Sequence, residues 1–137
     1  MMRAFVAFVF GLLWSAPAFA SDGPCASPPA SEGLIIESGG GKLSVVPDPG
    51  SKPVGEQFSL RLIPCDPGTS LSIPSLDATM PMHGHGMNYR PKITPQSDGS
   101  TLAEGMLFHM PGKWRLEVDV VANEKRQRVT RDFVVKP

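Results

Sequence analysis

Apolar and polar residues alternate with a period of two along several short segments of the chain. Residues 57–63 and 113–121 show this alternation most clearly. The apolar residues expected to face inward are Phe58, Leu60 and Leu62 in the first segment and Trp114, Leu116, Val118 and Val120 in the second. This period is typical of β-strands that are buried on one side. No window sustains the 3.6-residue period of an amphipathic helix.

Shorter apolar runs between turn residues predict the remaining strands. They lie at residues 34–36, 42–46, 71–76, 101–110 and 128–135. The inward set expected for residues 101–110 is Leu102, Met106, Phe108 and Met110. Together these segments predict an all-β fold, an immunoglobulin-like antiparallel β-sandwich of about seven strands in one domain at residues 34–137. The 14 glycines and 15 prolines suit its turns and disfavour helix interiors.

The first 20 residues have the features of a secretory signal peptide. Arg3 precedes an apolar stretch at residues 4–14, and residues 18–20 form an A-x-A cleavage site. The apolar stretch is shorter than the roughly 20 residues that span a bilayer. We therefore expect a signal peptide at residues 1–20, a flexible lead-in at residues 21–33, and a periplasmic product without a transmembrane span.

Cys25 and Cys65 are the two cysteines of the chain. In an oxidising compartment an even pair most often forms a disulfide. This one would close a loop of about 40 residues and stabilise the fold by roughly 4 kcal/mol in the chain-entropy model. The alternative is a thiol metal site or a redox pair, but the spacing is not that of a C-x-x-C motif. We expect the disulfide.

Charge and motifs exclude several classes of function. The 13 basic and 13 acidic residues balance, whereas a nucleic-acid partner requires a clustered basic surface. The sequence contains no G-x-S-x-G, P-loop or G-x-G-x-x-G motif and no Cys-His pair for nucleophilic catalysis, so we do not expect an enzyme. One basic cluster is expected to be a solvated turn, with anion or partner binding as the alternative: Lys125, Arg126, Arg128 and Arg131.

Beyond residue 20, every methionine and every histidine lies between residues 80 and 110. Thioether sulfur is a soft ligand that favours Cu(I), and imidazole suits both oxidation states of copper. Alternate residues of an extended segment share a face about 6.5–7 Å apart, so His83 and His85 could chelate one ion. His109 is out of phase with Phe108 and would face this pair if the two segments are neighbours. The residues expected to bind copper, with Cu(I) favoured, are Met80, Met82, His83, His85, Met87, His109 and Met110.

A packing interpretation of the same residues remains open. Met106 and Met110 share the parity of Phe108, which favours a role as core-filling thioethers. Met80 and Met82 either pack inward in the same way or bind metal. His83 and His85, each followed by glycine, could instead serve a tight loop. In that case the chain is a non-catalytic structural or interaction module of an envelope complex, and the Met/His segment is a packed loop.

Three stretches resemble, in order, segments of the YtkA-like domain family, which is related to the FixH-like group. They are residues 53–60 (PVGEQFSL), 78–87 (ATMPMHGHGM) and 108–118 (FHMPGKWRLEV). The resemblance implies an immunoglobulin-like β-sandwich outside the cytoplasmic membrane. Related domains occur beside heavy-metal efflux and oxidase-assembly proteins, which implies copper handling. The chain departs from the family pattern in its second histidine, its two cysteines and the absence of a Gly-Tyr pair near residue 99.

Taken together, these features predict a periplasmic copper-binding protein that buffers or delivers the metal. The expected partners are the metal ion and another copper-handling protein of the periplasm or membrane. No nucleic acid is expected among them.

Overall fold

The computed structural model describes residues 25, 34–38, 41–48, 54–66 and 68–137. The expected signal peptide at residues 1–20 lies outside these residues, as does the expected lead-in at residues 21–33 apart from Cys25. The described residues form nine strands and no helix. This part of the chain accordingly has no helix with the length and hydropathy needed to cross a membrane.

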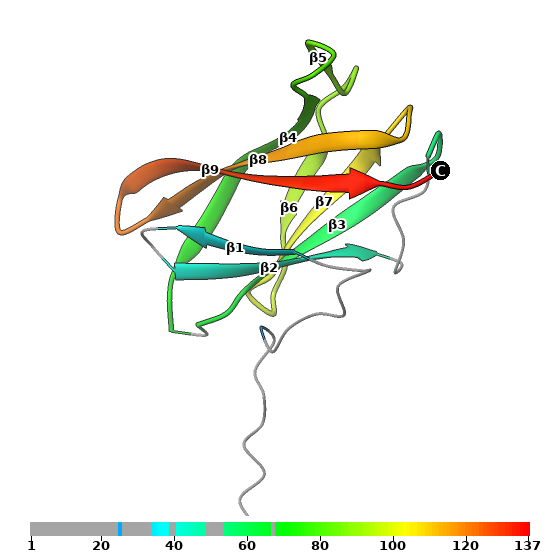
Figure 1. The fold of residues 1–137 in the computed structure, drawn as a ribbon. Helices are drawn as coiled ribbons and strands as arrows, with labels where there is room; N and C mark the ends of the chain where they lie inside the picture. Colours follow the sequence, from blue (N-terminus) through cyan, green and yellow to red (C-terminus); the bar gives the residue numbers. More distant parts are fainter. Residues whose placement is uncertain (1–24, 26–33, 39–40, 49–53, 67) are drawn as a thin grey trace, which may run out of the picture.

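The strands form two antiparallel sheets that face each other (Figure 1). The first sheet has the order β1 (Leu34–Ser38), β2 (Gly41–Asp48), β3 (Gln57–Pro64), β7 (Thr101–Leu107), β6 (Lys92–Pro95). The second has the order β5 (His85–Gly86), β4 (Leu71–Met80), β8 (Gly112–Ala122), β9 (Lys125–Val135). The orders β2-β3-β7-β6 and β4-β8-β9 match strands ABED and CFG of the immunoglobulin fold. The predicted sandwich is confirmed, with β1 and the two-residue β5 as additional strands.

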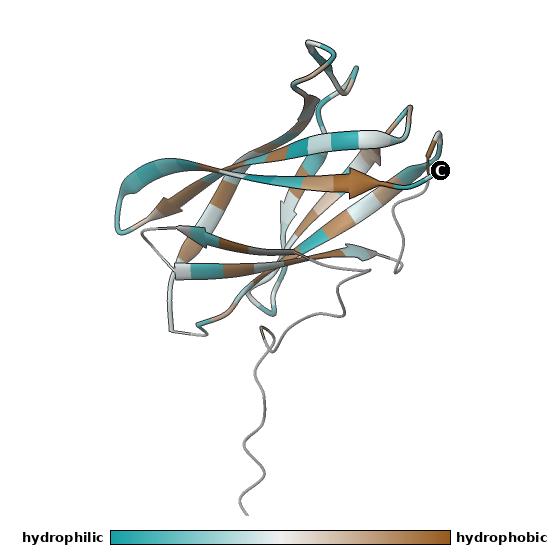
Figure 2. Cartoon of the chain, viewed as in Figure 1, coloured by the Kyte–Doolittle hydropathy of each residue, from teal (hydrophilic) through white to brown (hydrophobic). Residues whose placement is uncertain are grey.

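The core lies between the two sheets and is built from the alternating positions. All seven inward residues predicted for residues 57–63 and 113–121 are buried. Figure 2 shows the resulting alternation of hydrophobic and hydrophilic bands along the strands. Three aromatic rings gather in this core, since Phe108 lies 5.0 Å from Phe58 and 4.9 Å from Trp114 between ring centroids. Burying each such side chain contributes roughly 1.5–3 kcal/mol.

A β-bulge in β7 makes the prediction for its inward face wrong at Leu102. Phe58 pairs with Met106 while the next residue, Ser59, pairs with Glu104, so Gly105 is left over. Gly105 has a positive φ of 83°, which glycine adopts without steric cost. The extra residue changes the phase of the strand. Thr101 and Ala103 are therefore buried before the bulge, Met106 and Phe108 are buried after it, and Leu102 is only half-buried.

The strands expected at residues 34–36 and 42–46 are present as β1 and β2, whose antiparallel pairing ends at Ser38 and Gly41. The strand expected at residues 71–76 extends to Met80, with a bulge between Ser72 and Ser75 that accommodates Pro74. β6 was not predicted, because four residues ending in proline carry no clear alternation.

The predicted disulfide is present, joining Cys25 to Cys65 with their Cα atoms 5.4 Å apart. Cys65 directly follows β3, and its N–H donates a 2.9 Å hydrogen bond to the carbonyl oxygen of Lys42. Neither cysteine is a free thiol. The bond thus ties Cys25 to the end of a core strand.

Candidate functional site

The two Met/His segments meet at one end of the sandwich. Residues 81–84 connect β4 to β5, and residues 108–111 connect β7 to β8. β4 pairs with β8, and Thr79 lies opposite Arg115, so the end of β4 lies beside the start of β8. In Figure 1 the short connection around β5 projects beyond the rest of the sandwich. The fold therefore brings together two segments that are about 20 residues apart in the sequence.

Three imidazole rings lie in a row at this end. The ring centroids of His83 and His85 are 5.6 Å apart, and those of His85 and His109 are 5.0 Å apart. All three residues are exposed. An ion about 2.0–2.1 Å from a ring nitrogen lies about 3.2 Å from the ring centroid, so two rings on one ion have centroids at most about 6.4 Å apart. Both separations satisfy that limit, and His109 faces the first cluster as the parity of its segment suggested.

A complete set of nitrogen, oxygen or thiol ligands is not preformed. Within the described residues, no three His, Cys, Asp or Glu side chains are grouped so that they could hold a metal ion. One ion can therefore bind at most two of these imidazoles, either those of His83 and His85 or those of His85 and His109. A third donor has to come from a thioether or from a movement of the turn that carries His83.

The indole ring of Trp114 packs against two of the imidazoles. It is fully buried, and its ring centroid lies 5.3 Å from that of His109 and 6.5 Å from that of His85. Both imidazoles stand nearly perpendicular to the indole, at 86° and 72°. The indole Nε1–H donates a 3.0 Å hydrogen bond to the carbonyl oxygen of Met110. Trp114 therefore holds the β7–β8 connection in place while His85 and His109 pack over its ring.

The β4–β5 turn directs the side chain of His85 toward the indole of Trp114. His85 lies opposite Met80 in the ladder, and directly opposed residues place their side chains on the same face of a sheet. Because Met80 is buried, His85 is directed toward the inner side of the sandwich. The N–H groups of His83 and Gly84 both donate 3.0 Å hydrogen bonds to the carbonyl oxygen of Met80, which closes the turn.

The glycines that follow the two histidines have conformational and steric roles. Gly84 has a positive φ of 67° in the turn. At Gly86 a Cβ atom would lie 2.9 Å from the carbonyl oxygen of Ala78, so a side chain there would displace β5. Both roles agree with the packed-loop interpretation of this segment, and they also fix where the imidazoles lie.

The five thioethers differ in exposure. Met80 and Met106 are 2% and 0% exposed and belong to the core, and the Met80 methyl group packs against Gly112. Met87 and Met110 are half-buried against the same core. Met82 is 81% exposed. Met106 therefore fills the core, as one interpretation of the sequence expected. Met80 is also buried whereas Met82 is exposed, although the same two alternatives were open for both residues from the sequence.

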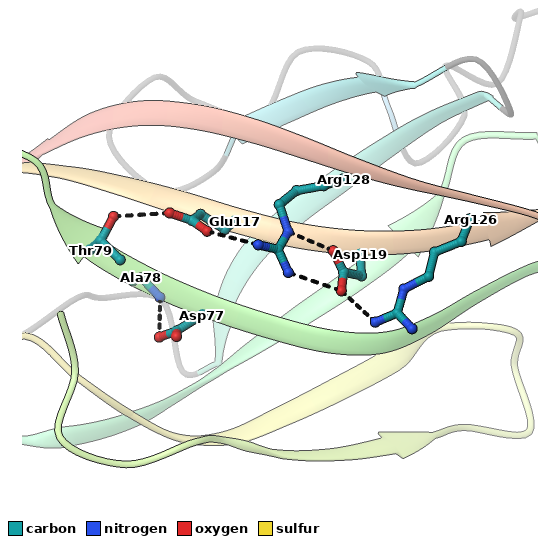
Figure 3. Close-up of polar contacts among 7 residues, drawn as sticks. All are labelled: Asp77, Ala78, Thr79, Glu117, Asp119, Arg126 and Arg128. Atoms are coloured by element: carbon teal, nitrogen blue, oxygen red, sulfur yellow. Dashed lines mark hydrogen bonds and ion pairs between the residues drawn. The ribbon is translucent and has the colours of Figure 1, made fainter.

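The basic cluster at residues 125–131 includes an ion-pair network between β9 and β8 (Figure 3). Asp119 has a side chain only 5% exposed and accepts hydrogen bonds from Arg126 at 2.6 Å and from Arg128 at 2.8 and 3.2 Å. Hydrogen bonds from Arg128 and then Arg126 lower the pKa of the Asp119 carboxyl to about 2. Arg128 also lies 3.6 Å from Glu117, which accepts a hydrogen bond from the Thr79 hydroxyl. Two of the four expected surface cations thus pair with acids of the neighbouring strand.

The chain matches no protein-family model, no curated protein and no solved structure in the comparisons made with each. The resemblance to YtkA-like domains therefore stays a prediction from the quoted motifs.

Proposed function

We propose that this protein binds copper, mainly as Cu(I), and buffers or delivers it outside the cytoplasmic membrane without catalysing a reaction. The observation that carries the proposal is the 5.0 Å separation of the ring of His85, in β5, from the ring of His109, in the β7–β8 connection. Two imidazoles at this separation can share an ion from an exposed position. The half-buried thioethers of Met87 and Met110 belong to the same two segments.

The chemistry of the donors favours copper over zinc. A structural zinc site is usually closed by four Cys, His or carboxylate ligands, and a catalytic one keeps three. The described residues provide no such group of three. Imidazole together with thioether is instead a donor set that suits Cu(I).

Ring separations and burial support a ranking of the candidate ligands within this proposal. His85 and His109 form the central pair, and His83, Met87 or Met110 completes the set. Met80 and Met106 fill the core, since each is buried. Met82 projects into solvent.

The location is part of the proposal. The Cys25–Cys65 disulfide is compatible with an oxidising, extracellular or periplasmic compartment. The A-x-A motif at residues 18–20 supports export. Membership of the YtkA-like family, and a copper-handling partner in the periplasm or membrane, are proposed on the motifs at residues 78–87 and 108–118.

Anaerobic titration with Cu(I) against a competing chelator tests the function. We expect the wild-type protein to withdraw one equivalent of Cu(I) from the chelator. We expect the double variant His85→Ala/His109→Ala to bind at least about 100-fold more weakly, because it loses two ligands. Lys125→Ala, an exposed residue at the far hairpin turn, is the control and should bind as the wild type does. Equally weak binding by the wild type and the double variant would contradict the proposal.

A structural or interaction module is the second candidate. It is favoured by the packing of His85 and His109 over the buried indole of Trp114 and by the tight fit of Gly86. On this account the double variant loses thermal stability, and the wild type has no measurable affinity for Cu(I). The same titration, combined with a melting curve, therefore separates the two candidates.

A further inference from the structure

We propose that Met82 is the exchange ligand of the copper site, through which Cu(I) passes to a methionine-rich segment of a partner protein. This inference rests on the proposed copper function. It assigns a role to the one candidate thioether that the fold leaves largely exposed. The partner is defined by its chemistry, which is a cluster of thioether donors.

The exposure of Met82 is the first observation. Its side chain is 81% exposed, whereas the side chain of Met80, two residues earlier, is 2% exposed. Burial is the ordinary state of methionine in a core, and it satisfies both the hydrophobic and the packing preferences of the side chain. Met82 instead leaves a large apolar side chain in water, in the connection between β4 and β5. A partner that brings apolar thioethers would cover it.

The position of Met82 relative to the imidazole row is the second observation. Met82 directly precedes His83, whose ring lies 5.6 Å from that of His85. The backbone here is held by the two hydrogen bonds from His83 and Gly84 to the carbonyl oxygen of Met80. These hydrogen bonds restrain the main chain of the turn, whereas the flexible thioether of Met82 is exposed and not packed into the core.

The exchange itself needs only a succession of coordinate bonds. The Met82 sulfur donates a lone pair to Cu(I) as one bond from the ion to an imidazole nitrogen breaks. A thioether of the partner then binds the ion, and the bond to Met82 breaks in turn. Each remaining bond from the ion to an imidazole or thioether of this protein breaks in the same way, as a further thioether of the partner binds. The thioethers are neutral and copper stays Cu(I), so the exchange of one thioether for the other moves no proton or electron. Thioethers suit the acceptor because thiols are oxidised outside the cytoplasm.

The test measures transfer and affinity separately. Cu(I)-loaded protein is mixed anaerobically with a synthetic peptide of alternating Met and Gly residues on resin, and the copper left in solution is measured at timed intervals. A matched peptide with Ser in place of Met reports unassisted dissociation. Met82→Leu removes the sulfur and keeps the size of the side chain, and Met106→Leu is the control from the core.

We expect Met82→Leu to slow transfer to the Met peptide about tenfold while changing the equilibrium affinity for Cu(I) less than about threefold. Met106→Leu should transfer at the wild-type rate. Transfer by Met82→Leu at the wild-type rate would overturn the exchange role and leave the copper function standing. An equal loss of rate and affinity would make Met82 an ordinary ligand and also overturn it. Failure of the wild type to bind Cu(I) would overturn both proposals.

Discussion

The imidazole of His85 lies 5.0 Å from that of His109, although one belongs to β5 and the other to the connection between β7 and β8. Two features of the fold produce this approach. The pairing of β4 with β8 sets the two connections side by side, and the buried indole of Trp114 supports both rings. The arrangement therefore depends on strand order and core packing as much as on the two histidines.

Copper binding should be visible in the fluorescence of Trp114, which is the only tryptophan after residue 20. Its ring lies 5.3 Å from that of His109, so a paramagnetic Cu(II) ion on the row would lie close enough to quench the indole. We expect one equivalent of Cu(II) to quench the emission of the wild type strongly. His109→Ala should lose most of this quenching. Equal quenching in both proteins would place the ion elsewhere.

Gly86→Ala should destabilise the protein, because its Cβ atom would lie 2.9 Å from the carbonyl oxygen of Ala78 and 3.2 Å from the Thr79 side chain. We expect a loss of about 1–3 kcal/mol in the free energy of unfolding, measured by chemical denaturation. Gly68→Ala is the matched control, since no atom lies within 4 Å of the added Cβ. Equal stabilities of the two variants would show that β5 can move away from β4 at no cost.

Asp119→Asn should weaken the outer face of the second sheet. The variant loses the charge that accepts hydrogen bonds from Arg126 and Arg128. We expect about 1.5–3 kcal/mol of destabilisation at pH 7. Glu124→Gln, at an exposed turn position, should change stability by less than about 0.5 kcal/mol.

The same carboxyl gives stability a pH dependence of predictable sign. Its pKa is lowered to about 2 in the folded protein, from the ordinary value of 3.8 for an aspartate carboxyl. A carboxyl with a lowered pKa stabilises the fold above its unfolded pKa, and that contribution is lost as the pH falls toward its folded pKa. Denaturation between about pH 4 and pH 2 should therefore show a steeper loss of stability in the wild type than in Asp119→Asn. Parallel pH profiles would contradict this assignment.

Peroxide should oxidise the methionines in the order of their exposure. Met82, at 81% exposure, should become the sulfoxide first, and Met80 and Met106, at 2% and 0%, should react last. Peptide mapping by mass spectrometry after timed oxidation of the metal-free protein measures this order. Early oxidation of Met106 would mean that the core opens more readily than its packing indicates.

Replacing both cysteines by serine should lower the stability by about 2–4 kcal/mol, because Cys25 and Cys65 close a long loop in the unfolded chain. Thermal melting of the double variant beside reduced and oxidised wild type measures the effect. The reduced wild type should melt with the double variant. An unchanged melting temperature would show that the bond carries no stability.

The fold was predictable wherever the period of two is unbroken. β3 and β8 alternate without interruption, so each inward side chain was identified from the sequence. β7 was not, because Gly105 adds one residue and reverses the phase for Leu102. A bulge depends on how the partner strand pairs, and one strand's pattern does not contain that information.

The site was predictable in composition but not in arrangement. The confinement of methionine and histidine to residues 80–110 identified the segments. The contact of Trp114 with the imidazoles of His85 and His109 was not predicted, because the alternating pattern of residues 113–121 identified Trp114 only as a core residue. The pairing of Asp119 with Arg126 and Arg128 was missed for a related reason, since cross-strand pairs depend on the register of β8 against β9. Met80 is buried and Met82 is exposed, and no feature of the sequence predicted this difference.

X-ray absorption at the copper edge of the Cu(I)-loaded protein shows whether His85 and His109 hold the metal, because it reports the atoms bound to the ion. We expect scattering from two imidazole groups together with at least one sulfur, and loss of the imidazole contribution in His85→Ala/His109→Ala. A wild-type spectrum without imidazole scattering, or one that the double variant leaves unchanged, would contradict the proposed copper site.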